Sequence, residues 1–133
     1  MSNDFLCPYC KGKLNLKGNL VLSVKNYEGK TGLIYLSPML GNYKTETHPG
    51  FSLSEGKPNE FYCPICHANL AALEFNEHLV KILMVDSQMG VYEILFSDIS
   101  GEHCTYKIKG PDVQSFGEDS DKYMNFFGAF PNY

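Results

Sequence analysis

Four of the five cysteines in this 133-residue chain lie in two short copies of one pattern. Residues 5–14 read FLCPYCKGKL and residues 61–70 read FYCPICHANL, so Phe, Cys, Pro, Cys and Leu recur in register. Each copy contains a CPxC turn, and 52 residues separate the two turns. A two-residue spacing lets one turn direct both sulfurs at one metal ion, and four thiolates suit tetrahedral Zn²⁺. The sequence therefore predicts one metal site, and its ligands are Cys7, Cys10, Cys63 and Cys66.

The paired turns resemble the two knuckles of zinc-ribbon proteins, and this resemblance covers residues 5–14 and 61–70. It implies that each knuckle leads from a β-hairpin and that the knuckles close around one structural zinc. Zinc ribbons occur in transcription, translation and replication proteins and as parts of enzymes, so the resemblance selects no task. Ribbon knuckles often have Gly after the second cysteine, where positive φ is useful, whereas this chain has Lys11 and His67 there.

Three other uses of the cysteines compete with structural zinc. CPYC also resembles the glutaredoxin active-site turn, but that motif needs a helix beginning at the turn, and the glycines of residues 11–19 argue against one. A rubredoxin-like iron site would use the same four thiolates and is less favoured than zinc. Disulfides would require an oxidising compartment, for which the sequence carries no signal.

The composition indicates a water-soluble protein with an acidic surface. Hydrophobic residues make up 44% of the chain and charged residues 20%, and no segment approaches the ~20 apolar residues of a membrane helix. The amino terminus lacks signal-peptide features, so a cytoplasmic location is expected. The net charge is −4, and the cations are eleven Lys with no Arg. Nucleic acid is therefore a poor candidate partner, and a protein partner is preferred.

Alternating apolar residues predict a mainly β fold. Residues 20–26 and 33–36 form one expected hairpin, and residues 43–47 a weaker strand. An antiparallel three-stranded meander is expected to follow over residues 79–85, 91–97 and 103–109.

The remaining segments leave the fold less determined. Residues 69–79 suit either a short helix or a strand, and Gly110-Pro111 is expected to end the sheet. Ser120 would cap a short helix over residues 121–127. The whole of residues 1–133 is expected to be a single domain, with a zinc-ribbon-like part at 1–78 and the meander and C-terminal segment at 79–133.

Several other residues could carry chemistry, although a structural role is the simpler interpretation of each. His67 could replace Cys66 as a ligand, but four cysteines already complete the site. Cys104 is expected to be a buried thiol, because it alternates with outward-facing polar residues. Asp98, Glu102 and His103 could form an acid/base group, yet a polar turn explains them as well.

Three functions remain in order of preference. The first is a non-enzymatic protein-interaction or scaffold module held together by structural zinc. The second is a small enzyme, or enzyme domain, with a site near the turn at 98–103. The third is a nucleic-acid-binding ribbon. Removing the metal is expected to unfold at least residues 5–75, whereas the meander at 79–109 could survive.

Overall fold

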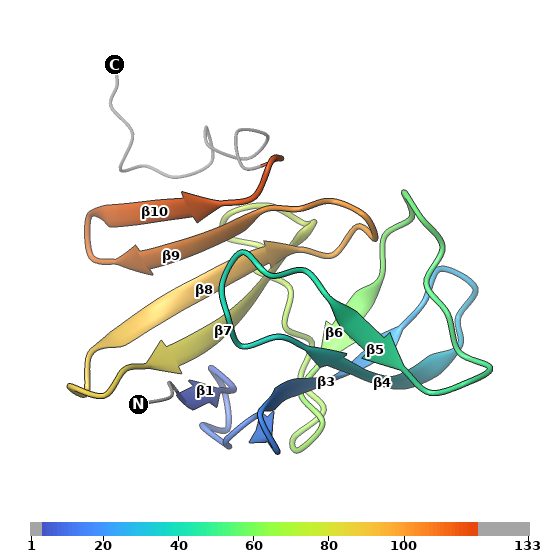
Figure 1. Ribbon diagram of the computed structural model, residues 1–133, viewed down its shortest axis with the longest axis horizontal. Helices are drawn as coiled ribbons and strands as arrows, with labels where there is room; N and C mark the ends of the chain where they lie inside the picture. The colour runs from blue at the N-terminus through green and yellow to red at the C-terminus, as the bar shows by residue number, and fades with distance from the viewer. Residues whose placement is uncertain (1–3, 120–133) are drawn as a thin grey trace.

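The computed structural model describes residues 4–119, which form ten β-strands in two antiparallel sheets (Figure 1). No helix occurs within these residues, and the helix expected at 121–127 lies outside them. One sheet has the order β1-β7-β8-β9-β10; the other has the order β2-β3-β4-β5, with β6 also paired to β3. The strands are β1 (Asp4–Leu6), β2 (Asn15–Leu16), β3 (Asn19–Lys25), β4 (Thr31–Leu36), β5 (Thr45–Thr47), β6 (Glu60–Tyr62), β7 (Leu79–Val85), β8 (Val91–Ser97), β9 (Thr105–Lys109) and β10 (Asp112–Phe116).

The mainly β prediction is confirmed, including the first hairpin and the meander, and two details differ. Gly110-Pro111 does not end the sheet: it lies in the tight connection to β10, which pairs antiparallel with β9. Residues 69–78 are neither helix nor strand, and Leu79 begins β7. Their turns are joined to the sheets by isolated bridges, Tyr62↔Asn69 and Ala71↔Val80. Leu73 is exposed there, so its helical spacing with Leu70 reflects no buried helix face.

The two sheets repeat one pairing pattern. In the β3–β4 pair Leu22 is opposite Ile34. Adding 60 to both numbers gives Ile82 opposite Ile94 in the β7–β8 pair of the other sheet. The same addition carries β4–β5 pairing into β8–β9 pairing, because Leu36↔Thr45 becomes Phe96↔Thr105. Residues 19–47 and 79–107 therefore have the same fold, although few residue types are shared between them.

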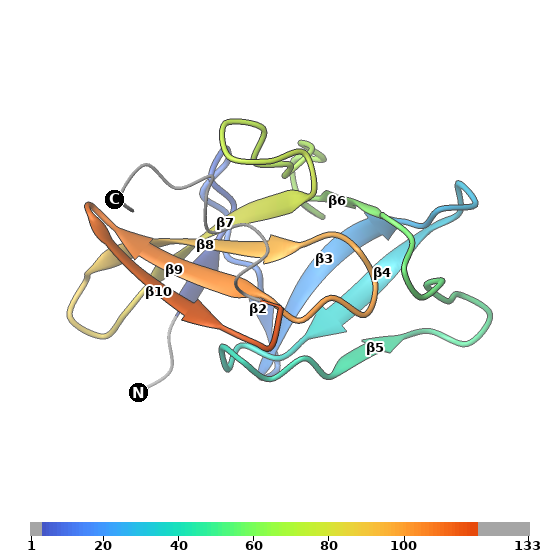
Figure 2. The same ribbon diagram turned by 90° about the horizontal axis from the view of Figure 1, so that it is seen from above.

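The core between the sheets follows this repeat. Its fifteen buried residues are seven equivalent pairs and Phe51. The pairs are Phe5/Phe61, Cys7/Cys63, Leu14/Leu70, Leu20/Val80, Leu22/Ile82, Val24/Met84 and Ile34/Ile94. Both copies thus bury the same face of each strand, and the two faces pack against each other as one cluster. Figure 2 shows the two groups of strands from above.

A second, smaller cluster lies on the other face of the β7–β9 sheet. Tyr106 and Leu95 are fully buried there, and the 72–79 segment covers them through Ala72 and Phe75. Cys104 belongs to this cluster and is 1% exposed, which confirms the expected buried thiol. Within the described residues, no helix is long and apolar enough to cross a membrane.

Candidate metal centre

Each knuckle crosses from one strand to a returning segment by the same backbone hydrogen bonds. In the first, the amide of Leu14 donates to Phe5 O, and the amide of Cys7 donates to Gly12 O at 3.0 Å. In the second, Leu70 donates to Phe61 O, and Cys63 to Ala68 O at 3.0 Å. The two CPxC turns are therefore equivalent in conformation as well as in sequence.

The four cysteine sulfurs form one compact cluster, within 4.8 Å of one another. Cys7 Sγ lies 3.7 Å from Cys66 Sγ, and Cys10 Sγ lies 3.8 Å from Cys63 Sγ. Tetrahedral thiolates at a Zn–S distance of ~2.3 Å would place their sulfurs about 3.8 Å apart. The cluster therefore has the spacing of a four-coordinate metal site, whereas a disulfide would need sulfurs about 2 Å apart. It could bind a metal ion.

Backbone amides surround the two buried sulfurs. Cys7 Sγ accepts from the amides of Tyr9 and Cys10, and Cys63 Sγ accepts from those of Ile65 and Cys66, all at 3.3–3.4 Å. Such donors stabilise thiolates, but four thiolates this close repel one another. The cluster can ionise fully only with a cation among the sulfurs, which is the chemistry of a metal centre.

The protonation of the two buried thiols shows this conflict. Burial raises the pKa of Cys7 to about 11, and its neighbouring sulfurs add to the rise. Burial also opposes ionisation of Cys63, yet the amides of Cys66 and Ile65 lower its pKa to about 7. Because the two positions are structurally equivalent, we interpret this difference as one pair that loses its first proton readily and its second with difficulty.

The residues after the second cysteines adopt the left-handed conformation that glycine usually supplies. Lys11 has φ of 63° and His67 has φ of 68°. The turns therefore keep their conformation without glycine, and Lys11 and His67 adopt a backbone conformation that is strained for residues with a Cβ. At Gly12 a Cβ would lie 2.6 Å from Cδ1 of Ile65, which reaches across from the other knuckle, so a larger residue there would have to displace the end of that side chain.

Replacing His67 by glycine is expected to stabilise the folded protein by about 1 kcal/mol, because glycine adopts positive φ without a Cβ clash. His67→Ala is the matched control, since it removes the imidazole and keeps the Cβ. Denaturant unfolding of both variants would measure the effect. Equal stability of the two variants would contradict strain at this position.

The knuckles connect the two sheets. The first is entered from β1, which pairs with β7, and leaves to β2, which pairs with β3. The second is entered from β6, which pairs with β3, and leaves through Ala71, which bridges to Val80 of β7. Each half of the chain therefore gives its first strand to the other half's sheet. A metal held by both knuckles would fix this exchange at its crossing point.

The histidine beside the cluster is not part of it. His67 is exposed, and the compact group contains the four cysteines without it. Cys10 and Cys66 are exposed and Cys7 and Cys63 buried, so one side of the cluster faces solvent. Lys13 forms an ion pair with Asp4 at 3.2 Å, which is exposed at both partners. These charges therefore contribute little to the site itself.

Asp98, Glu102 and His103 each have a different side-chain partner elsewhere in the chain. Asp98 faces His78, with Oδ1 3.2 Å from Nδ1, and Glu102 Oε1 accepts from Ser97 Oγ at 2.6 Å. His103 stacks on Tyr43, with ring centroids 4.6 Å apart and the planes 5° from parallel. The sequence did not reveal either partner. Only the folded chain brings Tyr43 beside His103 and His78 beside Asp98.

Asp98 should make stability depend on pH. Burial raises the pKa of its carboxyl to about 6 from an ordinary 3.8, against the lowering effect of His78. A raised folded-state pKa means that protonation stabilises the fold, so this contribution grows as pH falls from about 6 to 4. The free energy of unfolding of wild type, minus that of Asp98→Asn, should therefore increase as the pH falls through this range.

Urea unfolding at several pH values would measure this difference. In a His78→Ala background the increase should be larger, because the imidazole opposes the rise in pKa. Parallel pH profiles for wild type and Asp98→Asn would contradict the assignment.

The geometry also bears on the redox alternative. The CPYC residues form a turn that leads to a bridge between Leu6 and Lys13, and no helix begins at the motif. The first thiol therefore lacks the helix N-terminus on which glutaredoxin-type chemistry depends. Comparison with known proteins adds no relative: no family model, curated protein or solved structure matches the chain.

Proposed function

We propose that Cys7, Cys10, Cys63 and Cys66 bind one structural Zn²⁺ and that the chain is a zinc-ribbon-like scaffold or protein-interaction module of the cytoplasm. The observation that carries this proposal is the sulfur cluster, in which each half supplies one buried and one exposed thiol. Four protein ligands complete a tetrahedral shell and leave no position for substrate or water. The metal therefore has a structural role.

The interaction role is supported by the surface beside the cluster. Tyr9 and Ile65 occupy the same place in the two knuckles and are 60% and 55% exposed. Large apolar side chains at the rim of a rigid, metal-fixed element suit contact with another protein. The acidic, Arg-free composition argues against nucleic acid as that partner.

Native mass spectrometry with elemental analysis tests the metal assignment. We expect one zinc per chain and a colourless protein, and Cys104→Ser should keep the metal because Cys104 lies in the second core cluster. An iron-containing, coloured protein would replace zinc with iron in the same site. A chain purified without any transition metal, with thiols that do not take up zinc, would refute the proposal.

A further inference from the structure

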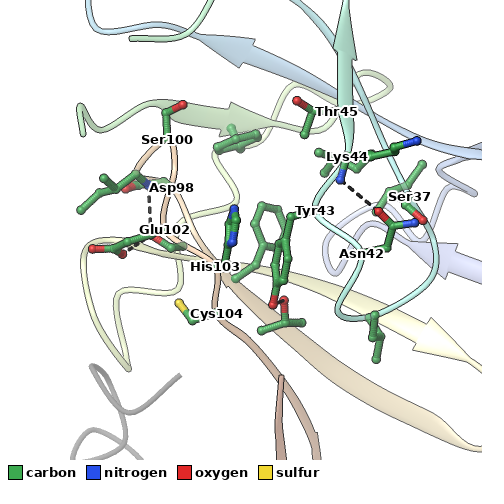
Figure 3. A pocket seen from close by; sticks show the side chains of 18 of the residues that line it. Ser37, Asn42, Tyr43, Lys44, Thr45, Asp98, Ser100, Glu102, His103 and Cys104 are labelled. Carbon is green, nitrogen blue, oxygen red and sulfur yellow. Dashed lines mark hydrogen bonds between the residues drawn. The ribbon is translucent and has the colours of Figure 1, made fainter. Parts of the chain in front are cut away.

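Equivalent residues of the two halves contact each other where the halves meet. Tyr43 and His103 occupy the same place in the repeat, and their rings stack with the centroids 4.6 Å apart (Figure 3). In a symmetric pair of subunits, a residue meets its own equivalent only beside the two-fold axis. The halves of this chain are therefore arranged about an approximate two-fold axis that passes close to these rings.

The knuckles contact each other with the same reciprocity. Cys7 and Cys63 are the equivalent first cysteines, and Cys10 and Cys66 are the equivalent second ones. Cys7 Sγ lies 3.7 Å from Cys66 Sγ, and Cys10 Sγ lies 3.8 Å from Cys63 Sγ. Each first cysteine thus contacts the second cysteine of the other half. The cluster has the arrangement of a metal site on the two-fold axis of a homodimer, to which each subunit gives two ligands.

The strands exchanged between the sheets repeat this pattern. Phe5 of β1 is opposite Met84 of β7, and the equivalent Phe61 of β6 is opposite Val24 of β3. Val24 and Met84 are themselves an equivalent pair of the core. Contacts of this reciprocal kind define an isologous interface, the kind that joins two copies of one subunit. The two halves therefore pack against each other as two identical subunits would.

The segment that joins the halves is divided between them. Asn26 Nδ2 donates to Ser52 O, which anchors the beginning of the segment to the first half. Gly56 N donates to Ser100 O, which anchors its end to the second half. Residues 53–55 lie between these anchors, and the last two of them are exposed. This stretch is a hinge at which the chain can open while both anchors stay in place.

We infer that a second copy of this chain is a partner of the fold, and that two copies exchange halves about this hinge. Each metal site of the exchanged dimer takes Cys7 and Cys10 from one chain and Cys63 and Cys66 from the other. The inference rests on the proposed metal centre and adds to it a partner of defined identity.

The exchanged dimer keeps the contacts of the closed chain. β1 pairs with β7 and the two knuckles meet as before, so the two forms differ only in the hinge and in the entropy of association. A short linker gives the closed chain an effective concentration in the millimolar range, so exchange requires chains at about 1 mM or a hinge too short to close. Because either form must open its metal site to convert, zinc traps the form in which the chain folded.

Deleting residues 53–55 from the full chain tests the hinge. Ser52 would then be joined directly to Gly56, and their anchors lie in different halves, so closure within one chain becomes strained. We expect a dimer that binds two zinc ions, measured by sedimentation velocity and elemental analysis. Inserting Gly-Ser-Gly after Ser54 is the matched control and should leave a monomer with one zinc. A monomeric deletion variant with one zinc would overturn the exchange.

Mixed cysteine variants test the shared site without altering the hinge. Cys7→Ser/Cys10→Ser and Cys63→Ser/Cys66→Ser each lack one knuckle, so neither completes a four-thiolate site within its own chain. Refolded together with zinc at about 1 mM, they should form mixed dimers that hold one zinc ion per pair, because the two intact knuckles meet in one of the two sites.

Native mass spectrometry identifies the mixed pair when one variant carries a heavy nitrogen isotope, since the two variants have the same mass. Each variant refolded alone is the control and should bind zinc at least tenfold more weakly. Mixed samples that hold no more zinc than the single variants would overturn the exchange.

These experiments separate the exchange from the metal assignment. If wild type binds one zinc and the mixed variants take up none, the exchange is wrong and the zinc centre stands. If wild type itself binds no zinc, the metal assignment is wrong. Sedimentation of the deletion variant still decides in that case whether the halves exchange, because a dimer is detected without any metal.

Discussion

Cys63→Ser and Cys7→Ser should each abolish tight zinc binding and leave the chain largely unfolded at neutral pH. Structural zinc contributes on the order of 10–16 kcal/mol of apparent free energy, which exceeds the total stability of many small domains. The two variants should suffer equally, because Cys7 and Cys63 are equivalent, are both 0% exposed and each accept two backbone amides. Zinc content and circular dichroism would measure the loss.

Two comparisons keep this prediction specific. Cys104→Ser changes a buried thiol outside the cluster, so it should retain zinc and fold. Cys66→Ser changes an exposed ligand, where water can complete the metal shell, and should lose less affinity than Cys63→Ser. Retention of zinc and of the native spectrum by Cys63→Ser would refute a shared metal site.

Removing the metal with a chelator should unfold both sheets together. The sequence alone predicted that only residues 5–75 would unfold with certainty. That expectation let the meander at 79–109 survive, since residues 5–75 seemed separable from it. In the structure β1 pairs with β7, and the Leu70 carbonyl accepts from Lys81 N. Hydrogen exchange after chelation should therefore show loss of protection in β3 and β7 alike.

The parts of the fold that were predictable from the sequence are those with local signals. The two CPxC turns mark their own positions, and alternating apolar residues mark β3, β7 and β8. The strand β10 was missed, because Gly110-Pro111 resembles a terminator when the partner strand is unknown. Residues 69–79 were ambiguous for a related reason: their turns are fixed by contacts with β6 and β7 rather than by their own periodicity.

The repeat beyond the knuckles could not be recognised from residue types. Tyr43 and His103 are equivalent and stack on each other, but a phenol and an imidazole look unrelated in a sequence. What the two copies share is the burial of alternate positions and the register of pairing, and both are properties of the folded chain.

Leu22→Ala and Ile82→Ala should each lower the free energy of unfolding by about 2–5 kcal/mol, the usual cost of truncating a fully buried aliphatic side chain. Both residues are 0% exposed, and they occupy equivalent positions in one shared core cluster. Because that cluster spans both sheets, each variant should shift a single cooperative transition, as expected of one domain.

Calorimetry and denaturant unfolding of the zinc-loaded protein would follow this shift by more than one probe. Leu33→Ala is the matched control: Leu33 is 48% exposed on β4, so its truncation should cost far less. If the two halves were separate domains, Leu22→Ala would lower one transition and leave a second at the wild-type midpoint, and Ile82→Ala would do the reverse. Coincident transitions in both variants would instead show that the exchanged strands and the common core make the repeated halves fold as a unit.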